Sequence, residues 1–102
     1  MARIVWTPQA ARQLEDVLAY LSERSYTYGE LLSVEIERAA GLIAEYPRIG
    51  RVVPELGRDD VREVIVDSYR MVYVIHRSSI SIVAVFHGAM DIGVRLRKAD
   101  LD

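Results

Sequence analysis

The sequence predicts an α+β fold, in which a short N-terminal strand and a two-helix antiparallel hairpin precede an antiparallel sheet. Apolar residues recur every three or four positions between residues 8 and 45, which is the period of amphipathic helices. Three apolar, β-branched runs follow, separated by pairs of polar residues as in β-hairpins. A length of 102 residues indicates a single domain over residues 1–102.

The first two elements are predicted to be a strand over residues 3–7 and a helix over residues 8–24. The strand residues are β-branched and aromatic, and we expect Trp6 to pack against the helices. Thr7 provides a hydroxyl N-cap, and Pro8 occupies the first helical position, where proline is favoured. The apolar residues of the helix form one stripe: Ala11, Leu14, Val17, Leu18 and Leu21.

A second helix is predicted over residues 28–45. Residues 25–29 interrupt the helical pattern, so about five residues would join the two helices, a length typical of antiparallel neighbours. The helix is expected to end before Pro47, because a residue that precedes proline avoids the helical conformation. Its apolar positions are spread more widely than one stripe: Leu31, Leu32, Ile36, Ala39, Ala40, Leu42 and Ile43.

The second half of the chain is predicted to form an ordered loop, three strands and a tail. Residues 47–57 are rich in Pro and Gly and are expected to be the loop. Strands are expected over residues 61–66, 69–77 and 80–86, and the short connections between them predict an antiparallel meander. Residues 87–102 form a C-terminal tail to which the pattern assigns no structure.

Both faces of the meander are expected to be apolar, whereas an antiparallel sheet with one wet face alternates apolar and polar residues. The helices can cover one face only. Strict alternation places Ile80, Ile82, Ala84 and Phe86 on one face of the last strand, opposite Val83 and Val85. Three possibilities are open for the other face: the tail folds back over it, the sheet curves over itself, or a partner or second copy covers it. If a partner covers it, the candidate binding residues are Val72, Val74, Val83 and Val85.

Composition and charge exclude several classes of protein. The 13 basic and 15 acidic residues give a net charge of −2, which excludes a globally basic nucleic-acid coat. Without cysteine there is no disulfide framework, and no metal or cofactor is expected. No apolar stretch approaches the ~20 residues of a membrane span and no signal peptide is recognisable, so a cytoplasmic protein is expected. Residues 46–99 contain nine basic and six acidic side chains, so an anionic partner is expected to bind there.

No motif of an established catalytic class is present, and the first candidate site residues are two strand arginines. Arg62 and Arg70 lie on or at the ends of predicted strands. An arginine in such a place can stabilise charge on a phosphodiester. It can also pair with a neighbouring carboxylate such as Glu63, or with a carboxylate of a partner.

The remaining candidates lie at the end of the last strand and in the tail. His87 can act as a general acid or base, or it can form a hydrogen bond to the backbone where the strand ends. Arg95 and Arg97 belong to a basic cluster at residues 95–98. This cluster can contact nucleic acid or an acidic groove, or it can be the solvated end of a helix.

Six short segments, in this order and spacing, resemble the ParE branch of the RelE/ParE toxin superfamily over about residues 3–91. They are residues 6–10 (WTPQA), 46–51 (YPRIGR), 54–56 (PEL), 61–63 (VRE), 68–73 (SYRMVY) and 85–91 (VFHGAMD). The resemblance implies a helix hairpin packed on a curved antiparallel sheet. It also implies a plasmid-stabilisation toxin of a type II toxin–antitoxin module, which causes growth arrest.

The resemblance further implies a cognate antitoxin, encoded beside the toxin, that wraps it in a hetero-oligomer. ParE-like members poison DNA gyrase by binding and need no hydrolytic residues or cofactor. In this role Arg62, Arg70, His87, Arg95 and Arg97 would be partner-contact or structural residues. The apolar face of the meander would be covered by the antitoxin.

Two alternatives remain open within the same superfamily. RelE-like members are ribosome-dependent, metal-independent mRNA endonucleases, and the matching candidates for catalysis here are Arg62, Arg70 and His87. The chain departs from that pattern, because Met90 stands where the family has Arg and the tail contains no Tyr. Met90 departs from the pattern of the ParE-like members as well. The second alternative is a non-toxic relative that acts only in antitoxin binding and autoregulation.

Overall fold

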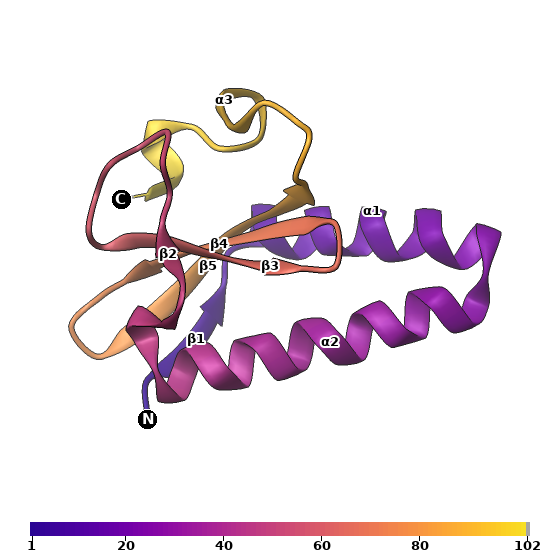
Figure 1. The fold of residues 1–102 in the computed structure, drawn as a ribbon, viewed down its shortest axis with the longest axis horizontal. Helices are drawn as coiled ribbons and strands as arrows, with labels where there is room; N and C mark the ends of the chain where they lie inside the picture. The colour runs from indigo at the N-terminus through magenta and orange to yellow at the C-terminus, as the bar shows by residue number, and fades with distance from the viewer. Residues whose placement is uncertain (102) are drawn as a thin grey trace.

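The computed structural model describes residues 1–101, so Asp102, the last residue of the expected tail, lies outside the described residues. It shows an α+β fold with a five-stranded sheet in the order β1-β5-β4-β3-β2. Two long helices lie on one side of the sheet and the short tail elements lie on the other (Figure 1). The elements are β1 (Arg3–Trp6), α1 (Pro8–Arg24), α2 (Tyr26–Glu45), η1 (Pro47–Ile49), β2 (Arg51–Val52), β3 (Val61–Val66), β4 (Tyr69–Ile75), β5 (Ser79–His87), α3 (Ile92–Arg95) and η2 (Lys98–Leu101).

The helix hairpin is tighter than predicted. α1 has the predicted bounds, and the Thr7 hydroxyl accepts a hydrogen bond from the Ala10 N–H at 3.2 Å. The expected five-residue connection is wrong, because only Ser25 separates the helices. Its N–H donates to the Leu21 carbonyl and ends α1, while its hydroxyl accepts from the Tyr28 N–H and begins α2. Ser25 is therefore both the C-cap of α1 and the N-cap of α2, and α2 begins at Tyr26, two residues earlier than predicted.

The predicted antiparallel meander is confirmed, and two further strands extend it. β3 pairs with β4 and β4 pairs with β5, all antiparallel. β1 adds to β5 in parallel, with Arg3 opposite Ser79, which makes the sheet mixed. The two-residue strand β2, from within the predicted loop, adds to the opposite edge.

A β-bulge in β5 changes which residues face the helices. Val72 pairs with Ala84 and Tyr73 pairs with Ile82, so Val83 is an extra residue without an opposite neighbour. Such an extra residue reverses the alternation of side chains beyond it. The predicted faces of β5 are therefore wrong after Ile82, because Ala84 joins Val83 on the tail side and Val85 turns toward the helices.

Each face of the sheet carries its own hydrophobic core. The core on the helix side contains Ile36, Ile43, Met71 and Ile82, and Trp6 packs against it as predicted. On the other side the chain covers the sheet itself, through Val53 and Leu56 of the loop and Ile92, Leu96 and Leu101 of the tail. The expectation that a partner covers exposed valines is wrong for the free chain, since all four candidates are buried: Val72, Val74, Val83 and Val85.

Candidate functional site

Arg70 and Glu63 form the centre of a buried ion cluster on the tail side of the sheet. The Arg70 Nε donates to Glu63 Oε1 at 2.7 Å, and its two terminal nitrogens donate to the two carboxylate oxygens of Glu55, each at 2.8 Å. Arg51 of β2 donates from its Nε to the other oxygen of Glu63 at 2.6 Å. We call Arg51, Glu55, Glu63 and Arg70 the arginine–carboxylate cluster.

The cluster is balanced in charge and shielded from water at its centre. The Glu63 side chain is 0% exposed and that of Arg70 is 8% exposed. The bidentate hydrogen bonds from Arg70 lower the pKa of Glu55 to about 2, and the two carboxylates raise the pKa of Arg70. The Arg70 guanidinium also lies 5.4 Å from the centre of the Phe86 ring. Arg70 is therefore committed to contacts within its own chain.

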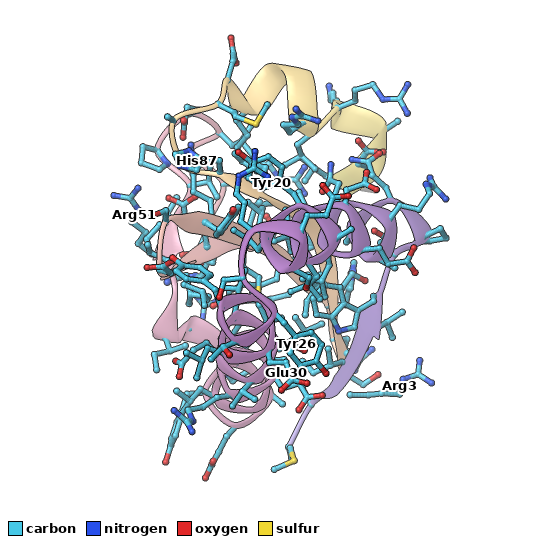
Figure 2. All side chains as sticks on the ribbon, turned by 90° about the vertical axis from the view of Figure 1, so that its right-hand side faces the viewer. Arg3, Tyr20, Tyr26, Glu30, Arg51 and His87 are labelled. Atoms are coloured by element: carbon cyan, nitrogen blue, oxygen red, sulfur yellow. The ribbon has the colours of Figure 1, made fainter. Side chains whose placement is uncertain are left out.

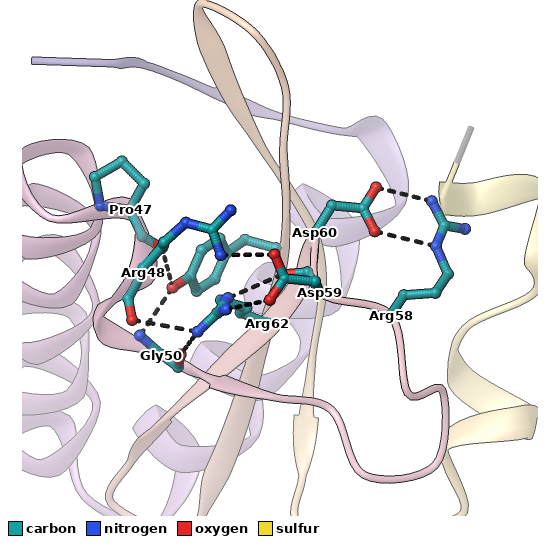
Figure 3. A network of polar contacts seen from close by, with 8 residues as sticks. Pro47, Arg48, Gly50, Arg58, Asp59, Asp60 and Arg62 are labelled. Carbon is teal, nitrogen blue, oxygen red and sulfur yellow. Dashed lines mark hydrogen bonds and ion pairs between the residues drawn. The ribbon is translucent and has the colours of Figure 1, made fainter.

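Arg62 holds the loop before β3 in place (Figure 3). It donates to the Asp59 carboxylate at 2.8 Å and to the Asp59 carbonyl at 3.0 Å. A further N–H donates to the Gly50 carbonyl at 3.0 Å. Arg48 binds the other oxygen of the Asp59 carboxylate at 2.7 Å, and the two arginines lower the pKa of Asp59. Arg62 thus holds Gly50 and Asp59, at the two ends of this loop, close to each other.

The buried Tyr73 hydroxyl forms hydrogen bonds to the backbone at the start of the same loop. It donates to the Pro47 carbonyl at 2.6 Å and accepts from the Gly50 N–H at 2.9 Å. A Cβ atom on Gly50 would lie 2.6 Å from both the Glu63 carbonyl oxygen and the Tyr73 hydroxyl oxygen. Only glycine permits this close approach, which brings η1 and β2 against β3.

His87 lines a cavity of about 490 Å³ between α1 and the tail. Its ring packs edge-on against Tyr69 at 5.7 Å, and its Nδ1 accepts a hydrogen bond from the Ala89 N–H at 3.1 Å. The predicted hydrogen bond to the backbone at the strand end is therefore confirmed. Figure 2 shows His87 and Tyr20, which also lines the cavity, at the same end of the molecule. Because Nδ1 accepts, the neutral ring carries its proton on Nε2.

The tail arginines differ in their surroundings. The Arg95 carbonyl accepts hydrogen bonds from the side-chain amides of Gln9 and Gln13, which tie the tail to α1. The Arg95 side chain lines the same cavity as His87, and its buried Nε has no hydrogen-bond partner among the described residues. The Arg97 side chain is exposed, and its Nε lies 3.8 Å from Oδ2 of Asp100.

The predicted site residues do not converge on one point. Arg62 and Arg70 belong to separate ion networks, and the four valines lie in the cores. His87 and Arg95 are brought together at one cavity. Among residues 1–101, no three His, Asp or Glu side chains are grouped so that they could hold a metal ion. No helix of this part of the chain is long and apolar enough to cross a membrane.

One surface was missed by the sequence prediction. α2 exposes large apolar side chains at Tyr28, Leu31 and Leu42. The unusually wide spread of apolar positions in this helix was the available signal. A helix that buries one face needs only one stripe, so the remaining apolar residues must lie on the surface.

One protein family and one named toxin each match most of the chain. Residues 4–92 match the family described as the ParE toxin of the type II toxin–antitoxin system parDE. The chain is 31% identical over 90 residues to a protein named Toxin RelE2 from Caulobacter vibrioides, and this match covers 87% of the chain and 98% of the relative.

A solved structure shares the fold. It is described as the chromosomal ParDE TA system from P. aeruginosa and superposes with a TM-score of 0.68 at 16% identity, covering 85% of this chain and 96% of the other. At that identity the likeness concerns the fold. The family match extends over most of the sequence, including α1, α2, the strands β2 to β5 and all of β1 except Arg3. The chain therefore belongs to the ParE toxin family of type II toxin–antitoxin systems.

Proposed function

We propose that this toxin acts by binding, as an inhibitor of DNA gyrase that a cognate antitoxin neutralises. The observation that carries the proposal is the pairing of Arg70 with Glu63 and Glu55. Metal-independent cleavage of a phosphodiester needs cationic groups available to the phosphate. Both strand arginines are instead used within the chain, Arg70 by two carboxylates and Arg62 by Asp59 and loop carbonyls.

The antitoxin and the cellular setting follow from the same family. We infer that the toxin forms a hetero-oligomer with its antitoxin in the cytoplasm and arrests growth when the antitoxin is lost, which would stabilise a plasmid that encodes both. A relative described as part of a ParDE system supports this partner. The accessible members of the predicted site, His87, Arg95 and Arg97, are proposed as partner contacts, with Arg62 and Arg70 as structural supports.

A supercoiling assay tests the gyrase target. Purified DNA gyrase, ATP and relaxed plasmid are mixed with the toxin, and both supercoiled and cleaved DNA are measured. We expect less supercoiling and more cleaved DNA, and prior addition of the antitoxin should restore supercoiling. The His87→Ala/Arg97→Ala variant should inhibit less than wild type, while Arg12→Ala, a matched change on exposed α1, should not differ. Undisturbed gyrase activity at a large excess of a toxin that stops growth would refute the proposed target.

A RelE-like mRNA endonuclease is the second candidate, and His87 favours it. His87 and Arg95 line one cavity, which places an acid–base group near a cation. The test is cleavage of ribosome-bound mRNA, and loss of cleavage in His87→Ala would support this candidate. If expression without antitoxin leaves growth unchanged, the non-toxic relative is the better description.

A further inference from the structure

The cavity of about 490 Å³ between α1 and the tail combines aromatic walls with charged groups that have no partner. Four aromatic side chains line it: Tyr20, Tyr69, Phe86 and His87. A volume of this size is within the range of sites for small organic ligands. We call it the α1–tail cavity.

Helix α1 brings an unused carboxylate to this cavity. Gln13, Asp16 and Tyr20 line it at the three- and four-residue spacing that places side chains on one face of a helix. The Gln13 amide is already used, because it binds the Val85 N–H and the Arg95 carbonyl. The exposed Asp16 carboxylate, by contrast, forms no hydrogen bond or ion pair with a residue in the described part of the chain.

The tail brings a complementary donor. Arg95 of α3 lines the cavity, and its buried Nε has no hydrogen-bond partner among residues 1–101. Leaving a buried donor unpaired costs free energy, so a ligand that accepts from this guanidinium would recover that cost. Although Asp16 and Arg95 line the same cavity, no ion pair joins them. The cavity therefore contains a carboxylate and a guanidinium, both available to a ligand.

The aromatic side chains give the cavity flat walls. The Tyr69 and His87 rings lie 5.7 Å apart at an interplanar angle of 79°, so they form a corner. The Tyr20 side chain is 53% exposed, and the Arg24 guanidinium lies over one face of its ring at 3.7 Å, which leaves the other face available. Aromatic rings of this kind stack on nucleobases of any sequence. The walls favour a flat heterocycle, and the charged groups decide which one.

A carboxylate and a guanidinium together match one nucleobase. Guanine has two adjacent acceptors, O6 and N7, which an arginine binds with two parallel hydrogen bonds. Its N1–H and N2 amino group donate side by side, and a carboxylate accepts from both. Adenine has the N1 acceptor beside its N6 amino group, so a carboxylate on that edge would meet a lone pair.

We propose that the α1–tail cavity binds the guanine base of a free guanine nucleotide. Asp16 accepts hydrogen bonds from N1–H and the N2 amino group, Arg95 donates to O6 and N7, and the base packs against the Tyr69 ring. The site is defined by binding alone, so it does not depend on whether the toxin acts on gyrase or on mRNA.

Titration calorimetry with free nucleotides tests the selectivity for the base. GMP is the probe, and AMP, IMP and 7-deazaguanosine monophosphate are compared with it. IMP lacks the N2 amino group that faces Asp16, and the deaza compound lacks the N7 acceptor that faces Arg95. We expect GMP to bind at least about tenfold more tightly than AMP and about threefold or more above the other two. Equal binding of GMP and AMP would overturn the assignment to guanine.

Two pairs of variants test the location. Asp16→Asn and Arg95→Gln each remove one charge from the cavity, while Glu15→Gln and Arg12→Gln are matched changes at exposed positions of α1 outside its lining. We expect the first two to weaken GMP binding about tenfold and the two controls to change it less than about twofold. Asp16→Asn should also reduce the preference for GMP over IMP. Unfolding in urea confirms that all four variants are folded.

The methionine methyl groups report the location in the unaltered protein. Met90 lines the cavity, whereas Met1 is 99% exposed at the N-terminus. Addition of GMP should shift the NMR signal of the Met90 methyl through the ring current of the bound base and leave that of Met1 unchanged. If GMP binds without shifting the Met90 signal, the nucleotide lies elsewhere and the location is wrong.

Two further results would decide against a free nucleotide. If the folded wild type does not bind GMP at millimolar concentrations, the cavity is not a nucleotide site. If a single-stranded RNA that contains guanine binds and GMP does not, the ligand is RNA. Inhibition of gyrase is measured without GMP, so failure of this inference leaves the proposed function untouched.

Discussion

Glu63 and Arg70, on adjacent strands, form a 2.7 Å hydrogen-bonded ion pair that is almost completely removed from solvent. Their residues are not directly opposite, because Glu63 pairs with Val72 and Arg70 pairs with Ile65. The diagonal arrangement lets one guanidinium reach both Glu63 within the sheet and Glu55 on the loop that covers it. The pair therefore joins the loop to the sheet.

Glu63→Gln should destabilise the fold strongly. The change removes the carboxylate charge beside Arg70, whose side chain is only 8% exposed, and breaking such a buried pair costs about 3–5 kcal/mol. Urea denaturation measures the free energy of unfolding. Glu55→Gln is the matched control; because the Glu55 side chain is 44% exposed, we expect a loss of about 1 kcal/mol or less. Equal losses in the two variants would contradict this account.

The stabilising effect of Glu55 should depend on pH. Arg70 lowers the pKa of Glu55 to about 2, so its contribution is fully present above the ordinary pKa near 4.5 and is lost as the pH falls toward 2. The difference in unfolding free energy between wild type and Glu55→Gln should be constant from pH 5 to 7 and should vanish progressively below pH 4.5. A difference that stays unchanged down to pH 2 would mean that the carboxylate contributes nothing through its charge.

Tyr73→Phe should loosen the loop around η1. It removes a hydroxyl that satisfies the buried Gly50 N–H and the Pro47 carbonyl, and leaving such groups unpaired costs about 1–3 kcal/mol. Tyr69→Phe is the control, because the Tyr69 hydroxyl makes no hydrogen bond to any residue in the described part of the chain. The free energies of unfolding of both variants are measured by chemical denaturation. A Tyr73→Phe variant as stable as the wild type would show that water replaces the hydroxyl.

Gln13 should control the attachment of the tail. Its amide oxygen accepts from the Val85 N–H at 2.9 Å, and its amide nitrogen donates to the Arg95 carbonyl at 3.2 Å. The Gln9→Ala/Gln13→Glu variant keeps the acceptor for Val85 but removes both donors to Arg95. Hydrogen exchange at Leu96 should become about fivefold faster, as for loss of a hydrogen bond of ~1 kcal/mol, with Val85 unaffected. In Gln13→Ala the Val85 amide should also exchange faster.

Much of the fold was predictable because it rests on local signals. The cap at Thr7, proline at the first helical position and the apolar period located α1 to the residue. The β-branched run of β3 and the polar pair after it located that strand equally well. The hairpin connection was missed, because a single serine that caps two helices has no distinctive pattern of its own.

The candidate site was less predictable, because its chemistry depends on partners from separate elements. The sequence alone indicated that Arg70 could bind a phosphate or a carboxylate, and the fold brings Glu63 and Glu55 to it from β3 and from the loop after β2. His87 was correctly predicted to bind the backbone, since its partner is two residues away. The exposed apolar side chains of α2 were indicated only by a surplus of apolar positions in the helix.

The sequence by itself determined the helices, the meander and the family, since each depends on residue types at short and regular spacing. Only the tertiary structure decided which valines face which core, because the bulge at Val83 is a property of pairing with β4. It also decided that the loop and tail cover the second face of the sheet, and that the strand arginines are neutralised within the chain. These outcomes depend on contacts between residues far apart in sequence, whose geometry no local pattern encodes.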